Sequence, residues 1–179
     1  GFLQGLRDLT ARYQIPLIFD EVVTGFRLAY GGAQEYYGVT PDLCCMGKIM
    51  GGGYPLAVVM GRSNILAVFD RGSSETDSYV NQIGTLNGNP IACAAGLATL
   101  TVLREEGAYQ RLRATGGRLR QALNEICADN GVAVQDCGED AIFDVFFTDR
   151  PVTNYREGLA GDTQMMSRFN SGLLERGIL

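Results

Sequence analysis

The chain has 179 residues, of which 46% are hydrophobic and 20% are charged, a composition typical of a soluble globular protein. This length suffices for one full hydrophobic core, or for one core and part of a second. The net charge of −5 and the scattered arginines argue against a nucleic-acid partner, because that binding depends on a basic face. No apolar run approaches the roughly eighteen residues that a membrane span needs, so we expect no membrane partner.

Histidine is absent from the sequence, and the five cysteines show no CxxC spacing. The missing histidine excludes every mechanism in which an imidazole acts as base, acid or ligand. The odd number of cysteines, three of them in apolar runs, disfavours disulfides and zinc, so we expect no metal site. A reducing compartment suits such a chain best, and the predicted location is cytoplasmic.

The apolar pattern predicts alternating helices and strands. Helical spacing of apolar residues, together with cap residues, predicts helices at residues 2–14, 90–106, 112–126 and 162–176. Short apolar runs predict strands at residues 17–19, 42–46, 56–60, 132–136 and 142–148. The first three strands are continuous apolar runs, which are typical of a parallel sheet buried on both faces.

This order of elements predicts an α/β fold with a mostly parallel sheet and flanking helices, followed by a smaller α+β unit. We expect the boundary near Gly107, which divides the chain into residues 1–106 and 107–179. The first residue is not Met and lies at the start of a predicted helix. We therefore expect the chain to be a fragment of a longer protein.

Lys48 is the single lysine among 15 basic residues. Arginine serves as well as lysine for a surface charge, so this bias suggests that Lys48 has a task that arginine cannot perform. Forming a Schiff base is such a task, because the guanidinium group is not deprotonated in proteins. Lys48 also follows a predicted buried strand and precedes three glycines, residues 51–53, whose backbone could lie close to a ligand. A chance surface lysine explains the composition alone equally well.

Asp20 ends the first predicted strand, 28 residues before Lys48, a separation that suits one strand–crossover–strand unit. If the two strands are parallel, both side chains lie at the carboxyl edge of the sheet, where open α/β sheets bind ligands. Pyridoxal phosphate (PLP) needs two such groups, a carboxylate for its ring nitrogen and an amine for its aldehyde. Taken by itself, Asp20 is more simply interpreted as a polar residue that ends a buried strand.

The same strand end supports a rival hypothesis, because an apolar run followed by Asp20 and Glu21 also describes the Walker B element of an ATPase. That fold needs a GxxxxGK[ST] loop to hold the phosphates. Here Ile49 follows Lys48, and Asp42 stands where the first glycine should be. These differences weaken the nucleotide-hydrolase hypothesis without removing it.

Residues 84–90 form a glycine-containing turn that leads into the predicted helix at residue 90. A helix N-terminus offers unpaired N–H groups and a partial positive charge, both of which suit a phosphate. Thr85 adds a hydroxyl donor beside Gly84. By itself, this segment is better explained as a capped helix preceded by a turn. It supports a phosphate site only in combination with Lys48 and Asp20.

Four segments, residues 17–27, 38–43, 47–55 and 84–90, resemble the class III aminotransferases of PLP fold type I in both order and spacing. Within that class, residues 27–38 are most similar to the glutamate-1-semialdehyde 2,1-aminomutase group. Val23 and Asn87 depart from that group's usual Met and Ser. The resemblance covers nearly the whole chain but only about the second half of a family member.

The resemblance implies a role for each candidate residue. Lys48 would be the internal-aldimine lysine and the proton shuttle, and Asp20 would pair with the pyridinium nitrogen. Val22 would pack against the ring. Thr85, in the turn with Gly84, would reach a cofactor phosphate, usually that of the neighbouring subunit, which implies a homodimer. The phosphate loop and the ring-stacking aromatic residue would precede Gly1.

These observations favour a PLP-dependent aminotransferase, or an aminomutase that moves the amine within one substrate. The substrate would be a small amino acid or amine. An ATPase-like hydrolase and a non-catalytic domain that keeps the fold for assembly are the alternatives.

Overall fold

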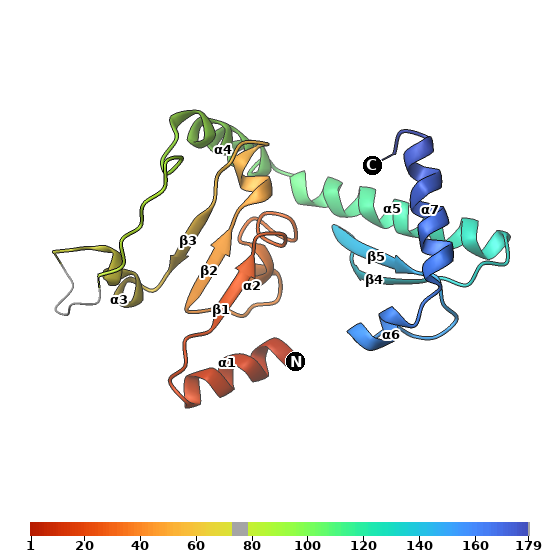
Figure 1. The fold of residues 1–179 in the computed structure, drawn as a ribbon, viewed down its shortest axis with the longest axis horizontal. Helices are drawn as coiled ribbons and strands as arrows, with labels where there is room; N and C mark the ends of the chain where they lie inside the picture. The colour runs from red at the N-terminus through yellow and green to blue at the C-terminus, as the bar shows by residue number, and fades with distance from the viewer. Residues whose placement is uncertain (73–78, 179) are drawn as a thin grey trace. The chain divides into compact units, whose positions relative to one another are not determined.

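A computed structural model of the chain describes residues 1–72 and 79–178, and they divide into two compact units, Gly1–Tyr109 and Gln110–Leu179 (Figure 1). The sequence placed the boundary near Gly107, three residues earlier than this division. We describe each unit separately.

The first unit is built around a three-stranded sheet in the order β1-β2-β3. Its strands are β1 (Ile18–Glu21), β2 (Leu43–Met46) and β3 (Val58–Gly61). Its helical elements are α1 (Phe2–Arg12), α2 (Gly32–Tyr36), the 3-10 turn η1 (Lys48–Gly51), α3 (Ser63–Leu66), the 3-10 turn η2 (Ala67–Phe69) and α4 (Pro90–Leu103). The short elements α2, η1, α3 and η2 carry too few residues for a periodic signal, and the sequence pattern did not predict them.

The sheet is only partly parallel, which corrects the prediction for residues 56–60. β1 and β2 are parallel, but β3 runs antiparallel to β2. A parallel connection needs a crossover of about a dozen residues or more. The 47–57 connection between β2 and β3 contains only the short 3-10 turn η1 and no crossover helix, so β3 turns back. β3 is also not buried on both faces, because Val59 is 50% exposed.

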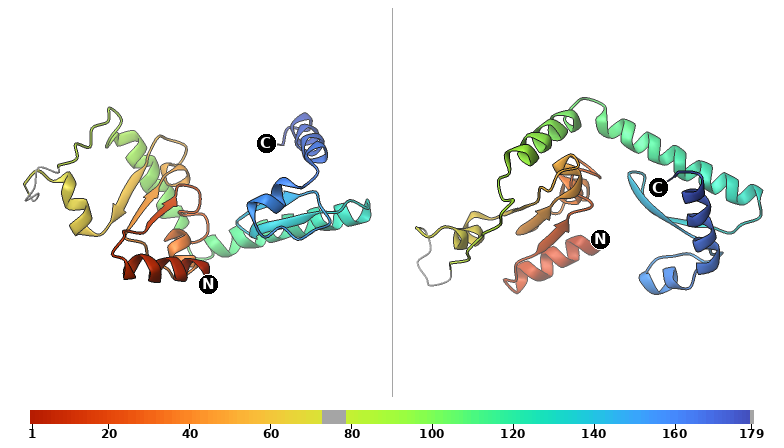
Figure 2. Two further views of the ribbon diagram at one scale, coloured as in Figure 1. Left: turned by 60° about the horizontal axis from the view of Figure 1, so that its bottom comes forward. Right: turned by 45° about the horizontal axis from the view of Figure 1, so that its top comes forward.

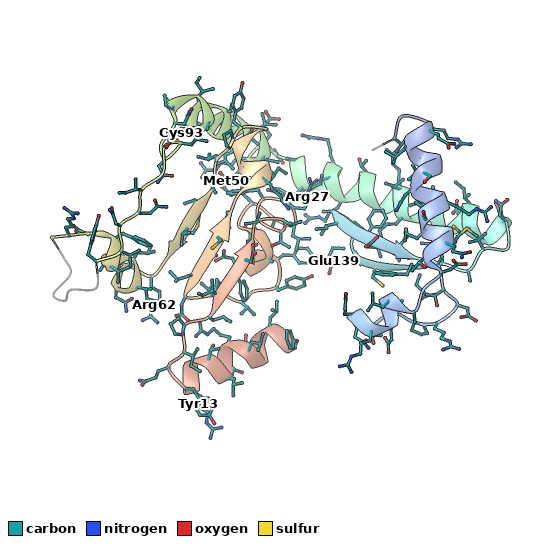
Figure 3. The ribbon with its side chains drawn as sticks, viewed as in Figure 1. Tyr13, Arg27, Met50, Arg62, Cys93 and Glu139 are labelled. Carbon is teal, nitrogen blue, oxygen red and sulfur yellow. The ribbon has the colours of Figure 1, made fainter. Side chains whose placement is uncertain are left out.

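One face of this sheet carries the core of the first unit. Cys44 and Met46 of β2 pack with Phe26 and Met50 in a buried apolar cluster. Helix α4 packs against η1. Its Gly96 makes this possible, because a Cβ built there would lie 2.9 Å from the carbonyl oxygen of Met50. Met50 is labelled in Figure 3, where η1 meets α4.

The second unit holds a two-stranded antiparallel hairpin and helices. The hairpin consists of β4 (Gln135–Glu139) and β5 (Ile142–Phe146), and it lies along α5 (Ala108–Asp129), the long helix that begins at the end of the first unit (Figure 2). Helices α6 (Tyr155–Leu159) and α7 (Thr163–Glu175) follow. Arg120 of α5 binds Asp136 and Asp140 of the hairpin, which fixes the helix against the strands.

Strand β4 begins three residues later than the sequence predicted. The reason is the end of α5, where Gly131 adopts a positive φ of 66° and the N–H of Val132 donates to the carbonyl of Cys127 at 2.8 Å. This is the bond pattern of a glycine-terminated helix. Residue 132 therefore still belongs to the helix cap, and pairing with β5 starts at Gln135.

Candidate functional site

Asp20 and Lys48 lie at the same edge of the sheet. In the parallel register of β1 and β2, Asp20 stands opposite Cys45 and Glu21 opposite Met46. Both strands therefore end together, and Lys48 is the second residue after β2. This is the arrangement that the sequence predicted, and both side chains are exposed.

The carboxylate of Asp20 is oriented by its own strand end. Its Oδ1 accepts the backbone N–H of Val22 at 3.0 Å. A carboxylate held in this way keeps its second oxygen available to a further donor. Asp20 can therefore bind a protonated nitrogen placed outside the sheet edge.

Lys48 occupies an unusual backbone position. Its φ is 48°, in the left-handed region that residues other than glycine rarely adopt, and it starts η1. Such a conformation persists only where the surrounding structure enforces it. The preceding Gly47 lies close to Val22, since a Cβ built on Gly47 would be 3.8 Å from Val22 Cγ1. Within the described residues the Lys48 amine has neither a hydrogen bond nor an ion pair, so it is available for chemistry.

Glu21 points to the opposite face of β1 and is fully buried, with 1% of its surface exposed. Its carboxylate accepts four hydrogen bonds, from Thr24 Oγ1, from the N–H groups of Ala33 and Gln34, and from the Gln34 amide. A Walker B glutamate must instead face a water molecule beside the nucleotide. The position of Glu21 therefore argues against the nucleotide-hydrolase hypothesis.

A mostly apolar cavity of about 720 Å³ lies beside the candidate residues. It contains Val22, but it does not include Asp20, Lys48, Gly84 or Thr85. The turn before α4 contributes Asn87 and Gly88. The complete lining consists of Val22, Cys45, Met46, Pro55, Leu56, Ala57, Val58, Val59, Phe69, Gln82, Leu86, Asn87 and Gly88.

The helix N-terminus beyond Thr85 does not offer the unpaired donors that the sequence suggested. Asn89 caps α4, because its Oδ1 accepts the N–H groups of Ile91 at 3.0 Å and Ala92 at 3.1 Å. The N–H of Cys93 donates to the Asn89 carbonyl. Any phosphate here must bind the preceding turn instead. Thr85 lies in that turn and is exposed, and its hydroxyl donates to no acceptor in the described part of the chain.

The sequence pattern did not identify Asp42 as a structural centre. This carboxylate is 5% exposed and accepts the Leu17 N–H at 2.8 Å, Arg7 at 2.8 Å and Arg62 at 3.0 Å. The Leu17 hydrogen bond and the two arginines hold the pKa of Asp42 well below its usual range. Asp42 precedes β2 and so lies at the end of that strand away from Lys48. Arg62 is labelled in Figure 3.

Two further properties bear on function. Among residues 1–72 and 79–178, no group of cysteine, aspartate and glutamate side chains could hold a metal ion. No helix in the same part of the chain is both long and apolar enough to span a bilayer.

Comparison with known proteins gives a consistent set of relatives. Residues 1–162 match the family model described as aminotransferase class-III. The glutamate-1-semialdehyde 2,1-aminomutase of Desulforudis audaxviator is 47% identical over 178 residues, which are 99% of this chain and 40% of that protein. The enzyme of the same name from Pelotomaculum thermopropionicum is 46% identical over the same shares.

Solved structures agree with these relatives. An omega-transaminase from Sphaerobacter thermophilus has a TM-score of 0.90 at 37% identity, over 99% of this chain and 40% of that one. A beta-phenylalanine aminotransferase from Variovorax paradoxus has a TM-score of 0.86 at 34% identity, over the same shares. The chain thus spans about two fifths of the length of the relatives that it matches.

Proposed function

Because the chain belongs to the class III aminotransferase family, we propose that it forms part of a PLP-dependent enzyme that moves an amino group on a small amino acid or amine. The observation that carries this proposal is the shared sheet edge of Asp20 and Lys48, set by the parallel register of β1 and β2. No observation favours a nucleotide hydrolase.

The residues at this edge fit PLP by their chemistry. When bound, PLP supplies an aldehyde that captures amines and a ring that delocalises the electrons of a broken bond to carbon. Lys48 would hold the aldehyde through its neutral amine and then carry a proton between the substrate carbon and the cofactor. Asp20 would accept a hydrogen bond from the ring nitrogen and keep that nitrogen protonated. Val22, beside Gly47, would pack against the ring.

The turn before α4 would bind the cofactor phosphate of a second subunit, so we also propose a homodimer. Thr85 and Gly84 lie in an exposed turn, and the Thr85 hydroxyl has no acceptor within the described residues. Ile83, Leu86 and Ile91 around it are large, exposed apolar side chains. Apolar surface beside an unused hydroxyl supports a contact with another chain.

Within the family we favour the aminomutase reaction over transfer between two substrates. The curated relatives described above carry the aminomutase name at 46–47% identity, whereas the omega-transaminase is 37% identical. We further assign residues 107–179 to part of the small C-terminal domain. We also propose a cytosolic location, which the five free cysteines support because disulfides form in oxidising compartments.

The decisive experiment is chemical trapping of the cofactor on Lys48. The full-length protein is incubated with PLP, reduced with borohydride and digested, and the peptides are weighed by mass spectrometry. We expect a pyridoxyl group on the peptide that contains Lys48, together with a visible or near-ultraviolet absorbance band before reduction. Lys48→Arg keeps the positive charge but cannot form the imine. It should therefore lose both signals.

A label on a different lysine, or a band that survives in Lys48→Arg, would contradict the assignment. Mutase and transferase activities are separated by incubating the enzyme with glutamate-1-semialdehyde and no other amino donor or acceptor. An aminomutase converts this substrate, whereas an enzyme limited to transfer does not.

A further inference from the structure

The most completely buried large side chain of the described residues is a carboxylate that the proposed chemistry does not use. Glu21 accepts Thr24 Oγ1 at 3.1 Å and the Ala33 N–H on Oε2. Its Oε1 accepts the N–H and the side-chain amide of Gln34, each at 3.1 Å. All of these donors belong to the segment between β1 and β2. Glu21 therefore ties that segment to the end of β1.

Two glycines show how closely the segment is fitted around Glu21. The N–H of Gly25 donates to the Glu21 carbonyl at 2.8 Å, and a Cβ built on Gly25 would lie 2.6 Å from that oxygen. Gly32 has a φ of 78°, and a Cβ there would collide with the Glu21 carboxylate. Both the backbone and the side chain of Glu21 are thus fixed. The end of β1 has little freedom to rotate.

This restraint acts directly on Asp20. Neighbouring residues of a strand point to opposite faces, so an inward Glu21 forces Asp20 outward. The N–H that orients the Asp20 carboxylate belongs to Val22, the residue on the other side of Glu21.

We propose that Glu21 is a positioning residue, whose buried carboxylate holds the end of β1 so that Asp20 faces the ring nitrogen of the cofactor. This inference rests on the proposed function. In this role, Glu21 neither donates nor accepts a proton during the reaction.

The informative substitution is Glu21→Gln, which keeps the shape of the side chain. One acceptor oxygen becomes an NH₂ group, which faces N–H donors from Ala33 or Gln34 and cannot accept them. The segment must shift to relieve this contact, and Asp20 shifts with Val22. With Asp20 displaced, the ring nitrogen of bound PLP would be less fully protonated. The positive charge next to Lys48 would then be smaller, and the pKa that governs the cofactor absorbance would rise.

The measurement is a pH titration of the cofactor absorbance in the full-length holoprotein, together with the affinity for PLP measured from the same band. In Glu21→Gln we expect the titration midpoint to move up by about one pH unit. We also expect PLP affinity to fall about tenfold to a hundredfold, as when a hydrogen bond to a charged group is lost.

Asp42→Asn is the matched control. Asp42 is also a buried carboxylate that accepts a backbone N–H, but it stands at the amino end of β2. This variant should lower the melting temperature and leave the titration midpoint unchanged. If Glu21→Gln does not fold, Gln34→Leu takes its place, because it removes the side-chain amide that donates to Glu21 and changes no charge. For Gln34→Leu we expect the titration midpoint to move up by less than in Glu21→Gln.

An unchanged midpoint in the folded Glu21 or Gln34 variant would overturn the inference, as would an equal shift in Asp42→Asn. Borohydride trapping on Lys48 in each variant separates this failure from a failure of the proposed function. If wild-type protein is not labelled on Lys48, both proposals fall. If wild-type protein is labelled on Lys48 and the variant has the same titration midpoint as wild type, only the role of Glu21 is wrong.

Discussion

Gly96→Ala tests how closely α4 must pack against the turn that carries Lys48. A Cβ at this position would lie 2.9 Å from the carbonyl oxygen of Met50 and 2.7 Å from Leu56 Cδ2. Both distances are shorter than a carbon atom tolerates, and the first involves backbone, which cannot rotate away. The matched control is Gly5→Ala in α1, where a Cβ would meet no atom within 4 Å.

Both substitutions gain helix propensity, but only Gly96→Ala also overpacks its site. Replacing glycine by alanine inside a helix stabilises it by up to about 1 kcal/mol. Overpacking a filled site costs about 1–3 kcal/mol. We therefore expect Gly5→Ala to raise the free energy of unfolding by up to about 1 kcal/mol and Gly96→Ala to lower it by as much as about 2 kcal/mol. The overpacking contribution alone separates the two variants.

Urea unfolding followed by circular dichroism measures both variants under the same conditions. Truncating Leu56 to Ala should make the Gly96→Ala substitution less costly, because one of the two clashes is removed. Equal stabilisation by Gly5→Ala and Gly96→Ala would refute the close packing of α4 on η1. The close packing would also be refuted if Gly96→Ala lowered the free energy of unfolding by the same amount in a Leu56→Ala background.

Two more predictions concern stability. Asn89→Ala removes the cap that accepts two N–H groups at the start of α4 and should cost about 1 kcal/mol in urea unfolding, whereas Asn89→Ser should restore most of it. Asp42 has a pKa lowered in the folded state, so its contribution is present above its unfolded pKa of about 3.9 and is lost as pH falls below that value. Asp42→Asn should therefore be less stable than wild type at pH 7 but lose less stability between about pH 4 and pH 2, as thermal unfolding at each pH would show. Parallel pH profiles for the two proteins would contradict this assignment.

Several features of this protein follow from local sequence alone. The Asn89–Pro90 pair predicts the start of α4, because an Asn side chain accepts the first N–H groups and proline needs no acceptor. The apolar runs before Asp20 and Lys48 predict two strands, and the spacing between them predicts a parallel crossover. The composition draws attention to Lys48, because arginine could not form the imine that we propose for this residue.

Other features depend on contacts between distant residues. The sequence does not reveal which of the two adjacent acids, Asp20 or Glu21, faces the interior. Glu21 is the buried one because Thr24, Ala33 and Gln34 supply hydrogen-bond donors to it. The direction of β3 likewise follows from its connection to β2, which contains no crossover helix. Local sequence thus determined where the longer helices and the strands form and which candidate side chains the chain offers, whereas packing determined where each side chain points, because burial and hydrogen-bond partners come from residues far apart in the chain.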